Sequence, residues 1–179
     1  MRGEAAVVVV GGGIIGCSIA YHLAAAGCRD VVLVEKGELT SGTTFHSVGL
    51  VSQFRTSPAD MRLMGDSIRL YRALAAEVGE AVGWRPVGSL RLASSPAMLK
   101  TLERRASRAR ALGLDVDVIG PAEALRLCPV MSGAGLHGAV RVPDDGYIEP
   151  SGITRELARR AAAGGAEIAT GTRVTGIEL

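Results

Sequence analysis

The hydrophobic pattern of residues 6–35 is that of a strand, a helix and a second strand. Residues 6–10 (AVVVV) form an unbroken apolar run rich in β-branched side chains, which predicts a parallel strand buried on both faces. Apolar residues then recur at helical spacing from Ile14 to Ala26, and Gly27 is a typical helix stop. The apolar run Val31–Val34 predicts the second strand. This order indicates a βαβ unit with a parallel, right-handed crossover, and hence an α/β fold.

The pattern beyond residue 35 is less regular. Residues 38–53 are rich in Ser, Thr and Gly without a clear period, which predicts an extended loop. Ser57-Pro58 is a typical helix start, and the apolar spacing that follows predicts a long amphipathic helix ending at Gly79. The later pattern predicts strands over 87–93, 115–119, 138–142, 166–170 and 173–179, a turn over 143–146, and helices beginning at Pro96 and spanning 121–127 and 151–163.

Composition and charge exclude several classes of protein. The 179 residues are 47% hydrophobic and 21% charged, as in a globular protein with a core. The net charge of +2 and the scattered basic residues argue against a nucleic-acid partner. No apolar run approaches the ~20 residues of a membrane span. The first ten residues lack signal-peptide anatomy, so we expect a cytoplasmic location. Three distant cysteines without a CxxC pair predict neither disulfides nor a metal site.

Glycines at positions 11, 13 and 16 form a GxGxxG motif between the first strand and the helix. Such glycines allow a tight turn, the approach of a pyrophosphate to the backbone, and close helix–strand packing. Glu35 lies nineteen residues beyond Gly16, where an acid can bind a ribose diol, and its charge argues against a 2′-phosphorylated cofactor. A glycine-rich turn with an incidental surface glutamate is the alternative interpretation. The motif by itself does not distinguish NAD from FAD.

The segment that follows Glu35 favours FAD. Residues 35–50 (EKGELTSGTTFHSVGL) resemble the dimethylglycine and sarcosine dehydrogenase branch of the D-amino acid oxidase-like flavoproteins. In that family a Thr-Ser-Gly-Thr-Thr-aromatic-His loop runs along the flavin, and its histidine is bonded covalently to the flavin 8α-methyl carbon. The match places this histidine at His46, with Phe45 where tryptophan is more usual. The similarity continues through residues 83–84, 88–93, 129–131 and 145–150.

The resemblance implies a set of FAD contacts, carried over residue by residue. They are Gly11, Gly13, Ile14, Ile15 and Gly16 in the glycine loop; Glu35 and Lys36 at the ribose; Gly42, Thr43, Thr44, Phe45, His46, Ser47, Gly49 and Leu50 along the pyrophosphate and flavin; and the backbone of Val174 at the adenine. Simpler roles stay open for some of them. Ile14 and Ile15 can serve only to pack the sheet, Lys36 can be a solvated charge, and His46 a loop histidine without a covalent bond. No catalytic residue is assigned, and Trp84 and Tyr147 are interpreted as packing residues.

The same resemblance implies an activity. Its members oxidise an N-methyl secondary or tertiary amine, such as sarcosine or dimethylglycine, by hydride transfer to the flavin. The imine product is hydrolysed or passed to tetrahydrofolate, which links the reaction to one-carbon metabolism, and the electrons leave to an electron-transfer flavoprotein or to oxygen. Three alternatives remain: another amine or amino-acid oxidase of the superfamily, a non-catalytic relative of the pyruvate dehydrogenase phosphatase regulatory subunit type, and an NAD-dependent dehydrogenase. His46 favours the enzyme over the regulator.

Together the pattern and the resemblance predict a Rossmann-type FAD-binding domain interrupted by the start of an α+β substrate domain. The expected parts are 1–82 (FAD-binding domain, first part), 83–150 (start of the substrate domain) and 151–179 (return to the FAD-binding domain). The predicted strand at 173–179 has no turn after it. We therefore expect the chain to stop before the enzyme is complete, and to be inactive by itself.

Overall fold

The computed structural model describes residues 3–178, and these divide into two compact units. Unit 1 comprises the described residues up to Gly49, Leu74–Gly83, and the residues from Ile148 onward. Unit 2 comprises Leu50–Ala73 and Trp84–Tyr147. Helix α2 (Pro58–Val78) contributes to both units, and a short 3₁₀ turn η1 (Gly79–Ala81) follows it. Residues 50–73, which the sequence grouped with the first domain, pack in unit 2.

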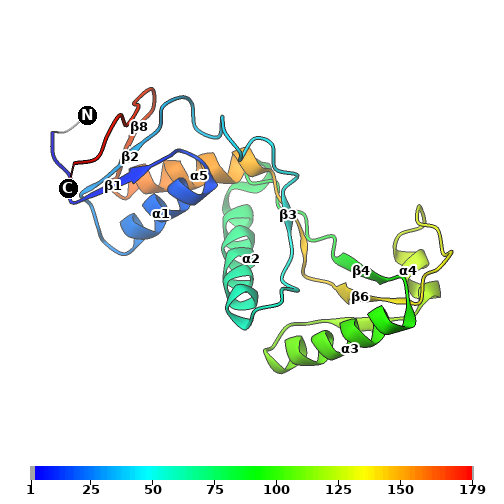
Figure 1. Ribbon diagram of the computed structural model, residues 1–179. Helices are drawn as coiled ribbons and strands as arrows, with labels where there is room; N and C mark the ends of the chain where they lie inside the picture. The colour runs from blue at the N-terminus through cyan, green and yellow to red at the C-terminus, as the bar shows by residue number, and fades with distance from the viewer. Residues whose placement is uncertain (1–2, 179) are drawn as a thin grey trace. The chain divides into compact units, whose positions relative to one another are not determined.

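Unit 1 is built on a parallel sheet in the order β1-β2-β8. Strands β1 (Val7–Val10) and β2 (Val31–Val34) pair in register, and β8 (Glu167–Ala169) lies on the other side of β2. Helix α1 (Ile14–Ala25) connects β1 to β2, and helix α5 (Pro150–Ala163) leads into β8. The two helices pack against each other beside the sheet (Figure 1). This is the parallel α/β arrangement that the sequence predicted.

The two central apolar runs differ in burial. All four residues of β2 are buried, as the unbroken run predicted. In β1 only Val9 is buried, whereas Val8 is 55% and Val10 61% exposed, so the prediction of a first strand buried on both faces was wrong. Val8 and Val10 lie on the face of β1 opposite to Val9 and are left uncovered there, and among the described strands β1 pairs with β2 alone, at one edge of the sheet.

The predicted strand at 173–179 was also wrong over its described residues. Residues 172–178 form no strand, and Leu179 lies outside the described part of the chain. The backbone of β8 pairs with β2 alone, and no described strand lies beside residues 173–178 to form a ladder with them. The alternating apolar and polar side chains of residues 173–178 therefore do not form a strand, because a strand also needs hydrogen bonds from its backbone to a neighbouring strand.

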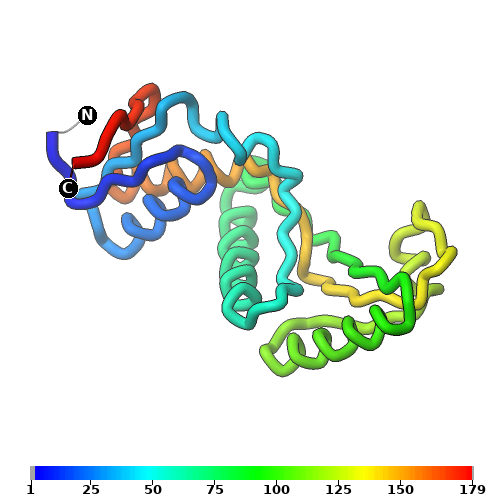
Figure 2. Tube along the Cα trace, in the orientation of Figure 1, coloured from blue at the N-terminus to red at the C-terminus, as the bar shows by residue number. Residues whose placement is uncertain are grey.

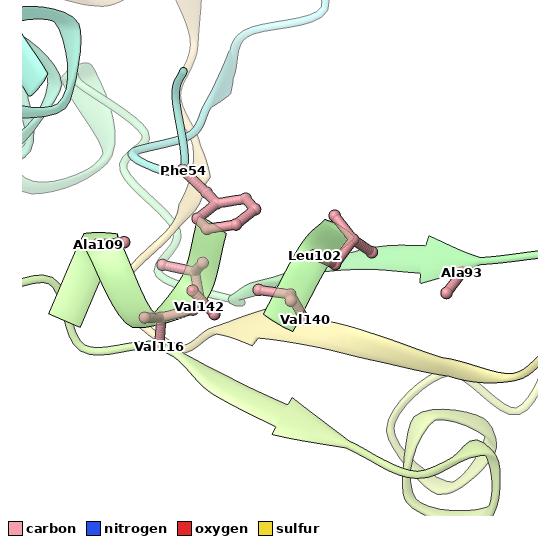
Figure 3. Close-up of a cluster of buried hydrophobic side chains, with 8 residues drawn as sticks. Phe54, Ala93, Leu102, Ala109, Val116, Val140 and Val142 are labelled. Carbon is pink, nitrogen blue, oxygen red and sulfur yellow. The ribbon is translucent and has the colours of Figure 1, made fainter. Parts of the chain in front are cut away.

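Unit 2 contains an antiparallel sheet in the order β4-β6-β5. Its strands are β4 (Ser89–Ala93), β5 (Asp117–Ile119) and β6 (Gly138–Val142). Helix α3 (Pro96–Ala111) packs on one face, where Phe54, Leu102, Val140 and Val142 meet in a buried cluster (Figure 3). Helix α4 (Pro121–Leu127) packs against β6, and its buried Ala124 contacts Ile119 and Ala139, whose side chains point away from the Val140 face.

A second pair of strands in unit 2 was not predicted. Strand β3 (Leu50–Val51) pairs antiparallel with β7 (Gly146–Tyr147), within segments that the sequence assigned to a loop and a turn. Fully buried Asp145 fixes the neighbouring chain, since its carboxylate accepts hydrogen bonds from Gln53 N (2.8 Å) and the Ser89 hydroxyl (2.6 Å). Strands of two residues are too short to leave a hydrophobic period. None of the helices within residues 3–178 is long and apolar enough to cross a membrane.

Candidate functional site

The glycine loop between β1 and α1 has the geometry that its motif predicts. Gly11 has φ 110°, a conformation open to glycine at no steric cost, and its N–H donates to Val34 O at the end of β2 (2.8 Å). A Cβ at Gly16 would run into the carbonyl oxygen of Gly11, so only glycine lets helix α1 lie this close to the loop. Gly13 is the N-cap residue of α1. The positive end of the helix therefore opens directly beside the loop.

Glu35 is fixed at the end of β2 by two backbone donors. Its carboxylate accepts hydrogen bonds from Gly12 N (2.7 Å) and Gly37 N (2.8 Å). The hydrogen bond from Gly12, followed by that from Gly37, lowers the pKa of Glu35 below its ordinary value. The carboxylate is therefore ionised and oriented, and each oxygen keeps a lone pair for a further donor such as a ribose hydroxyl.

Figure 2 traces the segment from Glu38 to Gly49, and hydrogen bonds attach this segment to the glycine loop and to helix α1. Thr40 N donates to Gly12 O (3.0 Å), and Thr40 is buried with φ 72°. The buried Thr44 hydroxyl accepts a hydrogen bond from Ile14 N (3.0 Å), in the first turn of α1. At the far end, Gly49 O accepts a hydrogen bond from Ile148 N (3.0 Å). The segment is therefore held by hydrogen bonds although it contains no helix or strand.

These parts surround a cavity of about 880 Å³ in unit 1. It is lined by β1, the glycine loop, Ile19, Glu35, Lys36, Thr40, Ser41, Gly42, Thr43, Thr44 and Ser47. A second cavity of about 250 Å³ is lined by Glu35 and Lys36 again, with Val10, Gly11, Val34, Thr172, Arg173 and Val174. Glu35 and Lys36 thus line both cavities.

The structure brings most of the predicted site residues together. Eleven of them line the larger cavity: Gly11, Gly13, Ile14, Ile15, Gly16, Glu35, Lys36, Gly42, Thr43, Thr44 and Ser47. Val174 lines the smaller one. Phe45, His46, Gly49 and Leu50 line neither cavity. Phe45 and His46 are exposed, and their rings pack edge to face at 5.5 Å.

The sequence interpretation missed several residues that line the cavities, among them Thr40, Ser41, Thr172 and Arg173. It also missed Gly12, which lines neither cavity but donates a hydrogen bond to Glu35. Gly12 could have been identified from the run of three glycines, since a Cβ there would lie 2.6 Å from Leu39 Cδ2 and 2.9 Å from Glu35 Cβ. Thr40 carries no such signal, because a positive φ at a threonine is set by the surrounding fold.

The arrangement fits a dinucleotide better than a metal ion or a reactive thiol. No cluster of three metal-ligating side chains occurs among residues 3–178. Burial, and then the negative charge of Glu35, raise the pKa of Cys17 to about 11, so its thiol stays protonated near neutral pH. The N-terminus of helix α1 can bind a phosphate, and the ionised Glu35 can bind a diol. The glycine loop lies between them and lets a ligand come close to the backbone.

Comparison with known proteins identifies the family. Residues 6–179 match the model of the DAO family, described as FAD dependent oxidoreductase. The chain belongs to this family. Membership decides between the two cofactors that the GxGxxG motif left open, in favour of FAD, and confirms the α/β fold and the predicted resemblance.

Individual members of the family are similar over almost the whole chain. Human mitochondrial sarcosine dehydrogenase is 41% identical over 174 residues, which is 97% of this chain and 19% of that protein. Mouse mitochondrial dimethylglycine dehydrogenase is 36% identical over 177 residues (99% and 20%). The mouse pyruvate dehydrogenase phosphatase regulatory subunit is 35% identical over 171 residues (96% and 20%). The chain therefore spans about a fifth of the length of these curated relatives.

A solved structure confirms the fold. The crystal structure of L-proline dehydrogenase from P. horikoshii superposes with a TM-score of 0.93 at 30% sequence identity, covering 98% of this chain and 46% of that one.

Proposed function

We propose that the larger cavity of unit 1 holds the pyrophosphate and the smaller one the adenine of FAD. The first turn of α1 supplies backbone N–H groups and a positive dipole for the phosphates. The Glu35 carboxylate, which borders both cavities, accepts hydrogen bonds from the adenosine ribose, and Lys36 lies beside it. The backbone of Val174 then lines the adenine. The hydrogen-bonded placement of Glu35 on Gly12 and Gly37 is the observation that carries this assignment.

We propose further that the protein oxidises an N-methyl amine of the sarcosine or dimethylglycine type. Bound FAD would supply the hydride acceptor. The proposal rests on the 41% and 36% identity to sarcosine and dimethylglycine dehydrogenases. The test is anaerobic mixing of the FAD-loaded full-length protein with sarcosine or dimethylglycine, expecting loss of the visible flavin band. Glycine and proline are the comparison substrates, because a glycine oxidase and a proline dehydrogenase share this fold. Faster reduction by either of those would contradict the N-methyl specificity.

We also propose that His46 is bonded covalently to the flavin. His46 is exposed, lies on a segment anchored at Thr44 and Gly49, and is eleven residues from Glu35. An extended chain advances ~3.3 Å per residue, so the segment is long enough to reach from ribose to flavin ring. A neutral imidazole nitrogen is the nucleophile available, while Thr43, Thr44 and Ser47 offer weaker hydroxyls.

Acid denaturation followed by gel electrophoresis tests the covalent bond. Flavin fluorescence should migrate with the polypeptide, and His46→Ala should release free FAD. His22→Ala, which changes a histidine of α1, is the matched control and should keep the flavin attached. If the wild type released all of its flavin, the covalent proposal would fail while the FAD site would stand.

A non-catalytic role is the second candidate, supported by the 35% identity to a phosphatase regulatory subunit. It predicts that FAD binds but that no amine reduces it.

The enzyme proposal also includes the electron acceptor, which is an electron-transfer flavoprotein or oxygen, and the transfer of the product to tetrahydrofolate. The cytoplasmic location stays a prediction, and the human and mouse relatives are named mitochondrial proteins.

A further inference from the structure

Unit 2 contains a cavity of its own on the α4 side of its sheet. Its volume, about 410 Å³, falls within the range of small-molecule sites. Apolar side chains form most of the wall: Val87, Leu90, Leu92, Leu127 and Met131. Leu90 and Met131 pack in turn on the buried cluster of Ile119, Ala124 and Ala139, so the floor of the cavity is continuous with the core of the unit.

Arg141 is the charged residue in this apolar wall. It lies on β6, the central strand, with Leu90 directly opposite on β4 and Asp117 directly opposite on β5. These three side chains share the face of the sheet that carries Ala139. The pairing fixes the backbone of Arg141 and the face of the sheet to which its side chain belongs, because both neighbouring strands are hydrogen-bonded to its own.

Arg141 is partly buried and has no carboxylate within ion-pair distance among residues 3–178. Other arginines of unit 2 are paired, such as Arg126 with Glu123 and Arg72 with Asp144. Asp117 is exposed and contributes negative charge across the strand pair without bonding to Arg141. An anion stabilises a partly desolvated guanidinium by pairing with its charge. If the anion also has an apolar part, that part can pack against the neighbouring apolar side chains.

The remaining polar group of the wall points to the same ligand chemistry. Ser89 pairs with Val142, so its side chain lies on the face of the sheet opposite to Leu90 and Arg141, where its hydroxyl donates to Asp145 (2.6 Å) and provides no donor to the cavity. Arg141 is thus the only strong donor among the residues that line the cavity. One cation in a small apolar wall favours a ligand that carries a single carboxylate on a short aliphatic group.

We propose that this cavity of unit 2 binds a small aliphatic carboxylate, with the guanidinium of Arg141 holding the carboxylate and the leucines and Met131 covering the aliphatic part. The site is separate from the FAD cavities, which lie in unit 1, and it does not depend on the function proposed above. The carboxylate could come from an amino-acid substrate or from a separate ligand that is not turned over. Both share the same recognition chemistry, and the experiments distinguish them.

The first experiment measures binding of butyrate, with butyramide and butylammonium as neutral and cationic analogues, by ligand-observed NMR titration. The wild type should bind butyrate at least about tenfold more tightly than either analogue. Arg141→Leu should remove this preference, Arg141→Lys should keep part of it, and the matched control Arg126→Leu should leave it unchanged. Asp117→Asn should strengthen butyrate binding, since it removes the competing charge. Equal binding of the three probes to the wild type would overturn the proposal.

The second experiment places the ligand in this cavity. Cys128 lines it, and Cys28 of unit 1 is a second partly exposed thiol that serves as internal control. Butyrate should slow the alkylation of Cys128 by iodoacetamide, followed by peptide mass spectrometry, and leave Cys28 unaffected. The protection should be lost in Arg141→Leu. If butyrate bound without protecting Cys128, its site would lie elsewhere and the assignment would be wrong.

The third experiment identifies the source of the carboxylate, using the FAD-loaded full-length protein with sarcosine and its neutral carboxamide. If the substrate supplies the carboxylate, Arg141→Leu should raise KM for sarcosine about tenfold or more and leave KM for sarcosinamide unchanged. If a separate ligand binds, both KM values should stay unchanged while butyrate binding is lost. Should no amine reduce the flavin, the proposed function fails, and the butyrate and Cys128 experiments still decide the carboxylate site.

Discussion

Glu35 is the residue whose chemistry the site defines most sharply. Both of its oxygens accept backbone hydrogen bonds, and an amide at this position could accept only one of them. Glu35→Gln should therefore weaken FAD binding by about 1–2 kcal/mol, or roughly 5- to 30-fold, without closing the cavity. Titration by calorimetry measures this effect. The exposed neighbour Glu38 provides the control, and Glu38→Gln should bind FAD as the wild type does; unchanged affinity in Glu35→Gln would refute the ribose assignment.

The residues of this site differ in how well a sequence can reveal them. Gly11, Gly16 and Glu35 were predictable because each satisfies a requirement that glycine or an acid alone meets at that spacing. Thr40 was not, since its positive φ and its bond to Gly12 arise from a contact across 28 positions of the chain. His46 and Phe45 entered through a family resemblance, and their roles in binding remain predictions.

At the scale of elements, Thr44 joins the segment 38–49 to helix α1. Thr44→Val removes the acceptor of Ile14 N and leaves a partly buried donor unpaired, which costs about 1–2 kcal/mol. We expect faster amide hydrogen exchange over residues 40–47 and weaker FAD binding. Thr44→Ser, which keeps the hydroxyl, should restore most of both.

Thr43 is exposed and provides the matched control for this experiment. Thr43→Val should leave the hydrogen exchange of the segment unchanged, because Thr43 has no hydrogen bond to α1 through its side chain among the described residues. If Thr43→Val and Thr44→Val had equal effects on exchange, the anchoring role of the Thr44 hydroxyl would be excluded.

Helix α5 carries an ion cluster that makes unit 1 sensitive to acid. Buried Glu156 pairs with Arg159 and Arg160, and Arg160 also pairs with Glu77. The hydrogen bond from Arg159, with that from Arg160, lowers the pKa of Glu156 from 4.5 to about 2. A lowered folded-state pKa contributes stability above pH 4.5, and this contribution is lost as the pH falls towards 2.

Denaturant unfolding of wild type and Glu156→Gln between pH 7 and pH 2 tests this cluster. The wild type should be more stable by about 1–3 kcal/mol at pH 7, an amount moderated by the exposure of Arg159, and the difference should shrink below pH 4.5. Glu103→Gln, on the exposed part of α3, should show no such pH-dependent difference. A difference that stayed constant down to pH 2 would rule out ionisation of Glu156 as its cause.

Helices and strands were predictable where their hydrophobic pattern is long and where the residues that fix their ends are close in sequence. Helices α2, α3 and α4 begin at the predicted prolines, and α5 begins at Pro150, one residue before its predicted start, because caps and N-terminal prolines act within one turn. Strands β3 and β7 were missed, and residues 173–178 were wrongly assigned to a strand, because a strand is defined by a distant partner. The exposed face of β1 has the same cause, since a run of valines does not reveal how many neighbours the strand has.

At the scale of the whole molecule, the division into two units separates two kinds of binding surface. Unit 1 provides groups for phosphate and ribose, while unit 2 provides an apolar cavity with one arginine. The order of α/β and irregular segments indicated such an interruption in the sequence. The sequence did not predict that residues 50–73 belong to unit 2. Helix α2 has one continuous apolar period, and this period does not change where the helix leaves unit 2 and enters unit 1.

The lining of the larger cavity of unit 1 allows a prediction of the relative affinities of the 179-residue chain for FAD and ADP. The groups proposed to contact the part shared by both ligands, Glu35 and the first turn of α1, are held by hydrogen bonds to Gly12 and Thr44. The apolar residues beside them, Val8, Val10 and Ile15, are 55%, 61% and 72% exposed, so no described side chain covers this wall, and a flavin ring packed on it would keep its outer face in water. We therefore expect FAD to bind to this chain at most about fivefold more tightly than ADP. Competition calorimetry measures the ratio, and a preference of roughly 100-fold, or about 2.7 kcal/mol, would show that the flavin is enclosed after all.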